Sequence, residues 1–176
     1  YPPVFVPMSG SAASVPFLAQ HGFRPTYFTG LNTLVEFATL YVEEARAAGS
    51  DYALGARQNI ARWIHLGRNE QEFTDKLLRY DYEMWVQHYS TFYDAIPKFD
   101  NTDATVQSMK DSGIFLGGTV EQLKTQWRHI FDRLPCEYIT LIWHYAHCPK
   151  ELMLEELGTF MTQVLPELDA AASDEH

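Results

Sequence analysis

The sequence has few cysteines and no long hydrophobic run, and these two shortages exclude several classes of protein. The two cysteines, Cys136 and Cys148, are too few for a disulfide framework and lack the paired spacing of a structural zinc site. We therefore expect two reduced thiols in a cytoplasmic protein and no bound metal. No stretch is long and apolar enough to span a bilayer, so we expect no membrane partner.

Basic residues are also scarce, because 13 Lys and Arg stand against 23 Asp and Glu, giving a net charge of −10. This charge disfavours nucleic acid or an anionic membrane surface as the main partner, so function must come from a local site. Hydrophobic residues make up 46% of the chain, enough to bury the core of a globular domain. We expect one domain over residues 1–168 and a disordered acidic tail over residues 169–176.

The first stretch combines an expected strand, a turn of small residues and the start of a helix. Residues 2–8 form the strand, Ser9, Gly10 and Ser11 the turn, and either Ser11 or Ser14 caps the helix. A helix N-terminus offers unpaired N–H groups and a partial positive charge, and the serines add hydroxyls without bulk. The stretch therefore suits a phosphate group, although an ordinary N-cap turn has the same residues.

Strands and helices alternate along the rest of the chain. Further strands are expected over residues 26–29, 60–66 and 138–143, and helices over 34–45, 72–89, 120–134 and 149–164. Residues 94–113 are expected to be a surface excursion with at most one short helix near 106–110. The resulting four strand–helix units predict an α/β fold with parallel strands and crossover helices. Such units close either as an open doubly wound sheet or as a (β/α)8 barrel.

Capping pairs mark the starts of two of these helices. Asn69 is followed three residues later by Glu72, and Thr119 is followed by Gln122. In such a capping box each side chain bonds the backbone N–H of the other residue, which satisfies donors that the helix leaves unpaired. Each pair predicts a helix that begins directly after its first residue, Asn69 or Thr119.

Several segments, in the same order along the chain, resemble bacterial-luciferase-like flavin-dependent monooxygenases. They are Pro3-Val4-Phe5-Val6-Pro7 with Ser9-Gly10-Ser11, Arg62 to Gly67, Gly118 to Leu123, Tyr138 to Leu141, Leu157 to Phe160, and Val164-Leu165-Pro166. The resemblance implies a (β/α)8 TIM barrel, of which this chain is similar to the C-terminal half. A whole barrel of this kind typically needs about 250 residues.

The resemblance also implies an activity and its cofactor. Members of the family use reduced flavin mononucleotide (FMN), or in some branches a deazaflavin, with dioxygen to oxidise a small organic substrate. By the same resemblance Ser9, Gly10 and Ser11 hold the flavin phosphate, and Phe28 packs against the flavin ring or fills the core. The implied partners are the substrate, a flavin reductase, and either a missing N-terminal half or a second copy of the chain.

Two histidines are candidates for catalysis because they lie at or near the ends of expected strands. His65 ends the third strand and His144 follows the fourth, where barrel chemistry gathers. A lone histidine at the end of a strand is, however, more often a packed or surface residue. Two alternatives to an enzyme remain open at this point: a non-catalytic half-barrel dimer that binds flavin or phosphate, and an open α/β module that binds phosphate alone.

Overall fold

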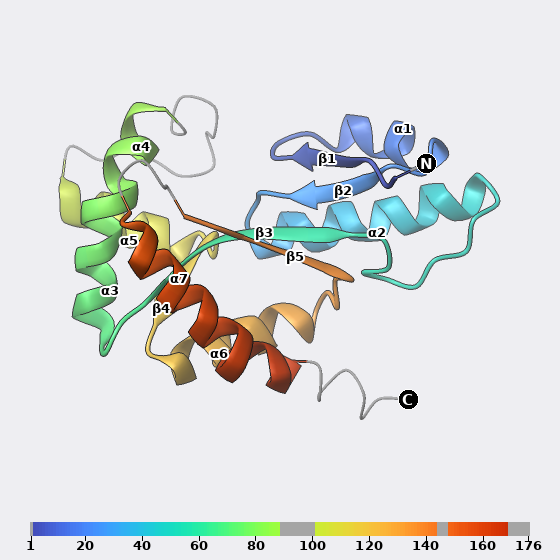
Figure 1. Cartoon of the computed structure of the whole chain (residues 1–176). Helices are drawn as coiled ribbons and strands as arrows, with labels where there is room; N and C mark the ends of the chain where they lie inside the picture. Colours follow the sequence, from blue (N-terminus) through green and yellow to red (C-terminus); the bar gives the residue numbers. More distant parts are fainter. Residues whose placement is uncertain (1, 89–100, 144–147, 169–176) are drawn as a thin grey trace. The chain divides into compact units, whose positions relative to one another are not determined.

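The computed structural model describes residues 2–88, 101–143 and 148–168 (Figure 1). The chain divides into two compact units: Tyr1–Arg62 with Ile130–Leu141, and Trp63–His129 with Ile142–His176. Strand β3 (Asn59–Leu66) begins in the first unit and ends in the second. Within the described residues no helix is long and apolar enough to cross a membrane.

The first unit holds parallel strands and two packed helices. Its elements are β1 (Phe5–Met8), the 3-10 turn η1 (Ala12–Ser14), α1 (Val15–Gln20), β2 (Arg24–Tyr27), α2 (Leu31–Ala47), the start of β3 and most of β5 (Tyr138–Ile142). Strand β1 pairs with β2 in parallel, β2 pairs with β3 in parallel, and β5 pairs with β3. Helix α2 buries one face at three- and four-residue spacing, comprising Leu34, Phe37, Ala38, Tyr41, Val42 and Ala45.

The second unit surrounds the end of β3 with helices and one more strand. Its elements are α3 (Glu70–Lys76), the π-helical turn η2 (Leu77–Asp81), α4 (Tyr82–Gln87), α5 (Thr102–Asp111), β4 (Phe115–Gly118), most of α6 (Val120–Phe131), α7 (Lys150–Thr159) and the π-helical turn η4 (Phe160–Val164). Strand β4 pairs with β3 in parallel. The rings of Trp63 and Trp85 lie 5.3 and 5.2 Å from that of Phe115 and fill this core.

The predicted parallel strands with crossover helices are confirmed, but the count of four strand–helix units is wrong because β4 is a fifth strand. Its sequence, Phe-Leu-Gly-Gly, is too short and too rich in glycine to show a strand pattern. Its position depends on the absence of a side chain at Gly117. A Cβ there would lie 2.3 Å from the backbone oxygen of His65 and 2.5 Å from the ring of Phe73.

The helices predicted to begin at Asn69 and Thr119 are confirmed at their starts, and other helices differ from the prediction in their bounds. Asn69 Oδ1 accepts from Glu72 N at 2.9 Å, but Glu72 Oε2 accepts from Arg68 N at 3.0 Å and not from Asn69 N. Thr119 Oγ1 accepts from Gln122 N at 3.3 Å and Gln122 Oε1 from Thr119 N at 2.8 Å, which completes the second box. The long helix expected over residues 72–89 is a continuous helical run from Glu70 to Gln87, in which the π-helical turn η2 lies between α3 and α4. Helix α5 is longer than the short helix expected near 106–110, because its cap, Asn101, lies further upstream. The predicted tail, 169–176, lies outside the described residues.

Candidate functional site

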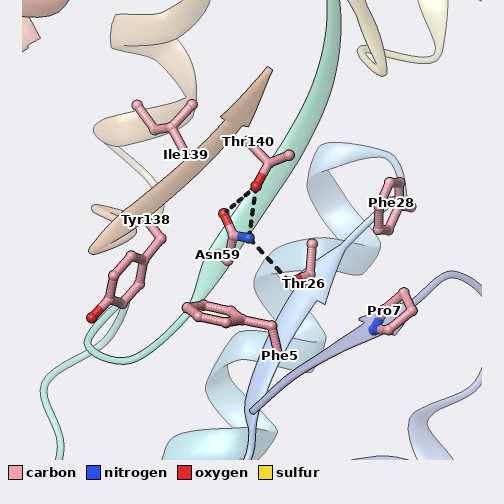
Figure 2. A pocket seen from close by; sticks show the side chains of 8 residues that line it. All are labelled: Phe5, Pro7, Thr26, Phe28, Asn59, Tyr138, Ile139 and Thr140. Carbon is pink, nitrogen blue, oxygen red and sulfur yellow. Dashed lines mark hydrogen bonds between the residues drawn. The ribbon is translucent and has the colours of Figure 1, made fainter. Parts of the chain in front are cut away.

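A pocket of about 430 Å³ opens in the first unit, on one face of its strands (Figure 2). It is lined by Phe5, Pro7, Thr26, Phe28, Asn59, Tyr138, Ile139 and Thr140. Side chains alternate along a strand, so Phe5 and Pro7 share a face of β1, as Thr26 and Phe28 share a face at the end of β2. The alternation explains why residues two apart on neighbouring strands line the same cavity.

Asn59 is the polar centre of this pocket. Its Nδ2 donates to Thr26 Oγ1 at 3.1 Å and to Thr140 Oγ1 at 2.9 Å, and its Oδ1 lies 3.3 Å from the Thr140 hydroxyl (Figure 2). These bonds join side chains from β2, β3 and β5 and fix the orientation of the amide. The pocket therefore has a rigid polar centre between apolar walls, the usual composition of a small-molecule site.

Two aromatic rings form one wall of the pocket, and a cation packs against both of them. The rings of Phe5 and Tyr138 meet edge to face, with centroids 5.1 Å apart. The Arg24 guanidinium lies 5.6 Å from the centroid of the Phe5 ring and 4.8 Å from that of Tyr138, and it donates to the Tyr138 hydroxyl. A hydrogen bond with Glu137 raises the pKa of Tyr138, so this hydroxyl is neutral at neutral pH. Arg24 thus holds the wall in place.

The turn predicted to hold a phosphate, Ser9 to Ser11, follows β1 directly and is exposed. Ser11 Oγ accepts from Ala13 N at 3.2 Å and so caps η1, whereas Ser14, the residue before α1, makes no side-chain cap bond. A Cβ at Gly10 would meet nothing within 4 Å, so the turn is open around its centre. The residues present fit a phosphate group, since small side chains leave the backbone of the turn accessible.

The structure brings this turn close to Phe28. The backbone N–H of Phe28 donates to Met8 O at 2.9 Å, and Met8 is the residue that precedes Ser9. Phe28 lies at the end of β2 and lines the pocket. Its backbone is therefore bonded to the last residue of β1, which is followed directly by the turn. Two of the predicted sites, the turn and the aromatic wall, meet at the same end of neighbouring strands.

His65 lies in the second unit, away from solvent, with a side chain 1% exposed. Its Nε2 lies 2.8 Å from Asp81 Oδ2 and its Nδ1 lies 3.1 Å from Glu156 Oε2. Burial alone would lower its pKa, but hydrogen bonds to Asp81 and Glu156 raise the pKa to about 9. The imidazole is therefore charged at neutral pH and donates from both nitrogens. Its role as a catalytic acid or base stays a prediction.

Glu156 extends this buried cluster. It accepts from Lys76 Nζ and from Trp143 Nε1, both at 2.8 Å, so two cations face two carboxylates. Sequence reasoning missed both carboxylates, although each interrupts an apolar stripe with four-residue spacing: Leu77, Asp81 and Trp85, and Leu152, Glu156 and Phe160. A carboxylate in such a position indicates that it has a buried cation or hydrogen-bond donor as its partner.

His144, the second candidate histidine, lies outside the described residues. Both cysteines are free, and burial raises the pKa of Cys136 to about 12 and that of Cys148 to about 11. Among the residues that the structure describes, no group of three or more His, Cys, Asp or Glu side chains could hold a metal ion.

Comparison with known proteins gives matches only among solved structures; no family model and no curated protein sequence matches the chain. One similar structure is the oxygenating constituent of 3,6-diketocamphane monooxygenase from Pseudomonas putida, in complex with FMN. Its TM-score is 0.73 at 18% identity, over 94% of this chain and 48% of that one. Another is the monooxygenase RslO1 from Streptomyces bottropensis, with a TM-score of 0.70 at 18% identity, over 95% of this chain and 48% of that one.

A third is an F420-dependent secondary alcohol dehydrogenase in complex with an F420–acetone adduct, with a TM-score of 0.58 at 13% identity. The match covers 80% of this chain and 43% of that one. The chain thus spans about half the length of the structures it matches. Likeness at this level of identity concerns the fold, and in its fold this chain matches luciferase-like flavin monooxygenases, as its sequence motifs predicted.

Proposed function

We propose that this chain is the flavin-binding half of a flavin-dependent monooxygenase and that Ser9, Gly10 and Ser11 hold the phosphate of FMN. The observation that carries the proposal is the bond from Phe28 N to Met8 O. This bond joins the end of β1, which leads into the turn, to the end of β2, which supplies Phe28 at the wall of the pocket. A molecule with a phosphate at one end and a flat ring at the other matches this pair of features.

The pocket has the size and walls that such a ligand needs. Its volume of about 430 Å³ lies within the usual range for small-molecule sites. Phe28 offers a flat apolar wall to the ring, and Asn59 sets a polar centre beside it. Bound reduced flavin would supply two electrons to dioxygen, so that one oxygen atom enters a small organic substrate and the other leaves as water. In this proposal Phe28 and Asn59 orient the ring.

The choice of cofactor rests on similar structures that bind two different groups. The P. putida enzyme is in complex with FMN, and the secondary alcohol dehydrogenase with an F420 adduct. We propose FMN, with a flavin reductase as the source of its reduced form. The substrate class is small organic molecules.

Fluorescence titration of the purified chain with FMN and with riboflavin tests this function. Riboflavin keeps the ring but lacks the phosphate, so we expect it to bind at least about tenfold more weakly than FMN, the equivalent of about 1.4 kcal/mol. Equal affinity for the two would contradict the phosphate site, and binding of neither would overturn the flavin assignment. Tighter binding of F420 than of FMN would replace one cofactor by the other.

Exposed apolar side chains in both units support a partner for this chain. In the first unit Phe5 on β1 is 38% exposed, and in the second Leu154 and Met161 on α7 and η4 are 55% and 50% exposed. Leu157 lies between these two at helical spacing, so the apolar side chains form a stripe. We propose that a complementary half barrel, either a missing N-terminal half or a second copy, covers these surfaces.

Light scattering coupled to size exclusion separates the two partners, with reduced FMN consumption as a second readout. A dimer without monooxygenase activity supports the non-catalytic half-barrel dimer, the second candidate function. A monomer that oxidises substrate only after an N-terminal half is added supports a split enzyme. A monomer that is active by itself contradicts the need for either partner.

A further inference from the structure

Arg62 is a fully buried cation in the first unit, with 0% of its surface exposed. Its three hydrogen-bond acceptors are all backbone carbonyls: Ala61 O at 2.8 Å, Thr29 O at 3.1 Å and Tyr27 O at 3.5 Å. Its Nε is buried without a hydrogen-bond partner. Burial lowers the pKa of Arg62 to about 10, so the group stays charged at neutral pH. The nearby Cys136 stays neutral, because burial raises its pKa to about 12.

Such a residue is costly if it only fills space. An unpaired buried charge loses its hydration, and an apolar side chain of similar volume often stabilises a core equally well. What an apolar side chain lacks is donors for the carbonyls that Arg62 reaches. The role of the guanidinium is therefore to be found in the backbone segments to which those carbonyls belong.

Two of the three carbonyls belong to the residues on either side of Phe28. Arg62 binds Tyr27 O and Thr29 O, while the N–H of Phe28 itself donates to Met8 O. Side chains alternate along β3, so Arg62 lies on the face opposite to Asn59 and the pocket. The backbone around Phe28 is thus held from behind, and its ring lies on the pocket side with Thr26 (Figure 2).

We propose that Arg62 is a positioning residue, whose guanidinium clamps the backbone on both sides of Phe28 and so sets the direction of that ring in the pocket. Its consequence for flavin rests on the function proposed above, whereas the clamp itself does not. A guanidinium suits this task because its donors form a rigid planar fork that reaches two carbonyls at once. A lysine has the charge but offers its donors from a single point.

Hydrogen exchange of the Phe28 amide tests the clamp without any ligand. In Arg62→Met, we expect exchange at Phe28 to accelerate by about tenfold or more, the equivalent of one lost hydrogen bond to a charged group. Arg62→Lys should give an intermediate acceleration, and it carries the same comparison if the methionine variant does not fold. Ile60→Val is the control, because it removes one buried methyl group from the same strand and leaves the donors of Arg62 in place.

A double-mutant cycle on FMN affinity then tests whether Arg62 acts through Phe28. We expect Arg62→Met and Phe28→Leu each to weaken FMN binding by about tenfold, and Arg62→Met to have no further effect once Phe28 is leucine. Additive effects would overturn the proposal. The proposal would also be overturned if Arg62→Met lost as much stability as Ile60→Val while the exchange of the Phe28 amide stayed unchanged.

The failure of the flavin assignment is distinguishable from the failure of the clamp. If the unmodified chain binds no FMN while Arg62→Met still accelerates exchange at Phe28, the proposed function is wrong and the clamp stands. If the unmodified chain binds FMN and Arg62→Met changes neither exchange nor affinity, the clamp is wrong and the proposed function stands.

Discussion

Raising the pH should destabilise this protein by neutralising one buried histidine. His65 donates to Asp81 and Glu156 from both ring nitrogens, which raises its pKa in the folded state to about 9 even though burial opposes the charge. In the unfolded chain the pKa returns to about 6.5. The folded state therefore binds the proton more tightly, and this contribution to stability is fully present below about pH 6.5. It is lost as the pH rises towards 9.

The size of the effect follows from the difference between the two pKa values. About 2.5 pH units at 1.36 kcal/mol each gives a contribution on the order of 3 kcal/mol. Glu156 and Cys148, whose pKa values are also shifted, change charge outside this range. Hydrogen bonds from His65 and Lys76, against an opposing effect of burial, lower the pKa of Glu156, so its contribution is lost only in acid. Burial raises the pKa of Cys148 to about 11, above this range.

This contribution is measured by urea unfolding of the unmodified chain and of His65→Gln at a series of pH values. We expect the difference in unfolding free energy between the two proteins to shrink by about 3 kcal/mol between pH 6 and 9.5. The difference between the two proteins removes the contribution of groups far from residue 65, so it reports on His65 and the two carboxylates that it bonds. Parallel curves over this range would refute the assignment of a charged imidazole.

Two further substitutions test the fold. Gly117→Ala should cost about 1–3 kcal/mol because its new methyl group meets the backbone of β3. Gly158→Ala, in open space on α7, should stabilise the protein by about 0.5–1 kcal/mol. Equal effects of the two in thermal denaturation would argue against the close approach of β4 to β3. Gln122→Ala should cost about 1 kcal/mol by breaking the capping box of α6. Gln107→Ala, which removes only an exposed bond to Asp111 within α5, should cost less than about 0.5 kcal/mol, and chemical denaturation distinguishes these outcomes.

Local features were predictable from the sequence because their causes are local. Asn69 and Thr119 act through backbone groups three residues away, and such spacing can be read directly from the sequence. The turn from Ser9 to Ser11 was also found from residue type, since small residues after a strand permit a tight turn. The alternation of strands and helices gave the parallel sheet for the same reason.

The remaining features depend on residues far apart in the chain. Strand β4 forms because β3 provides a pairing partner, and its own four residues do not show a strand pattern. Asn59 bonds Thr26 and Thr140 across 33 and 81 positions, so no sequence window contains the polar centre of the pocket. Arg62 looks like an ordinary strand residue until the carbonyls around Phe28 are placed beside it.

The central claim is that a phosphate binds at the turn from Ser9 to Ser11, and the affinity for FMN of Ser11→Asp tests it most directly. Aspartate caps a helix as well as serine does, so the fold should persist while a negative charge enters the phosphate site. Asn101→Asp is the matched control, because it places the same charge at the cap of α5 in the other unit. We predict that Ser11→Asp weakens FMN binding by at least about tenfold through charge repulsion and that Asn101→Asp leaves it unchanged. Unchanged affinity in Ser11→Asp would contradict the account.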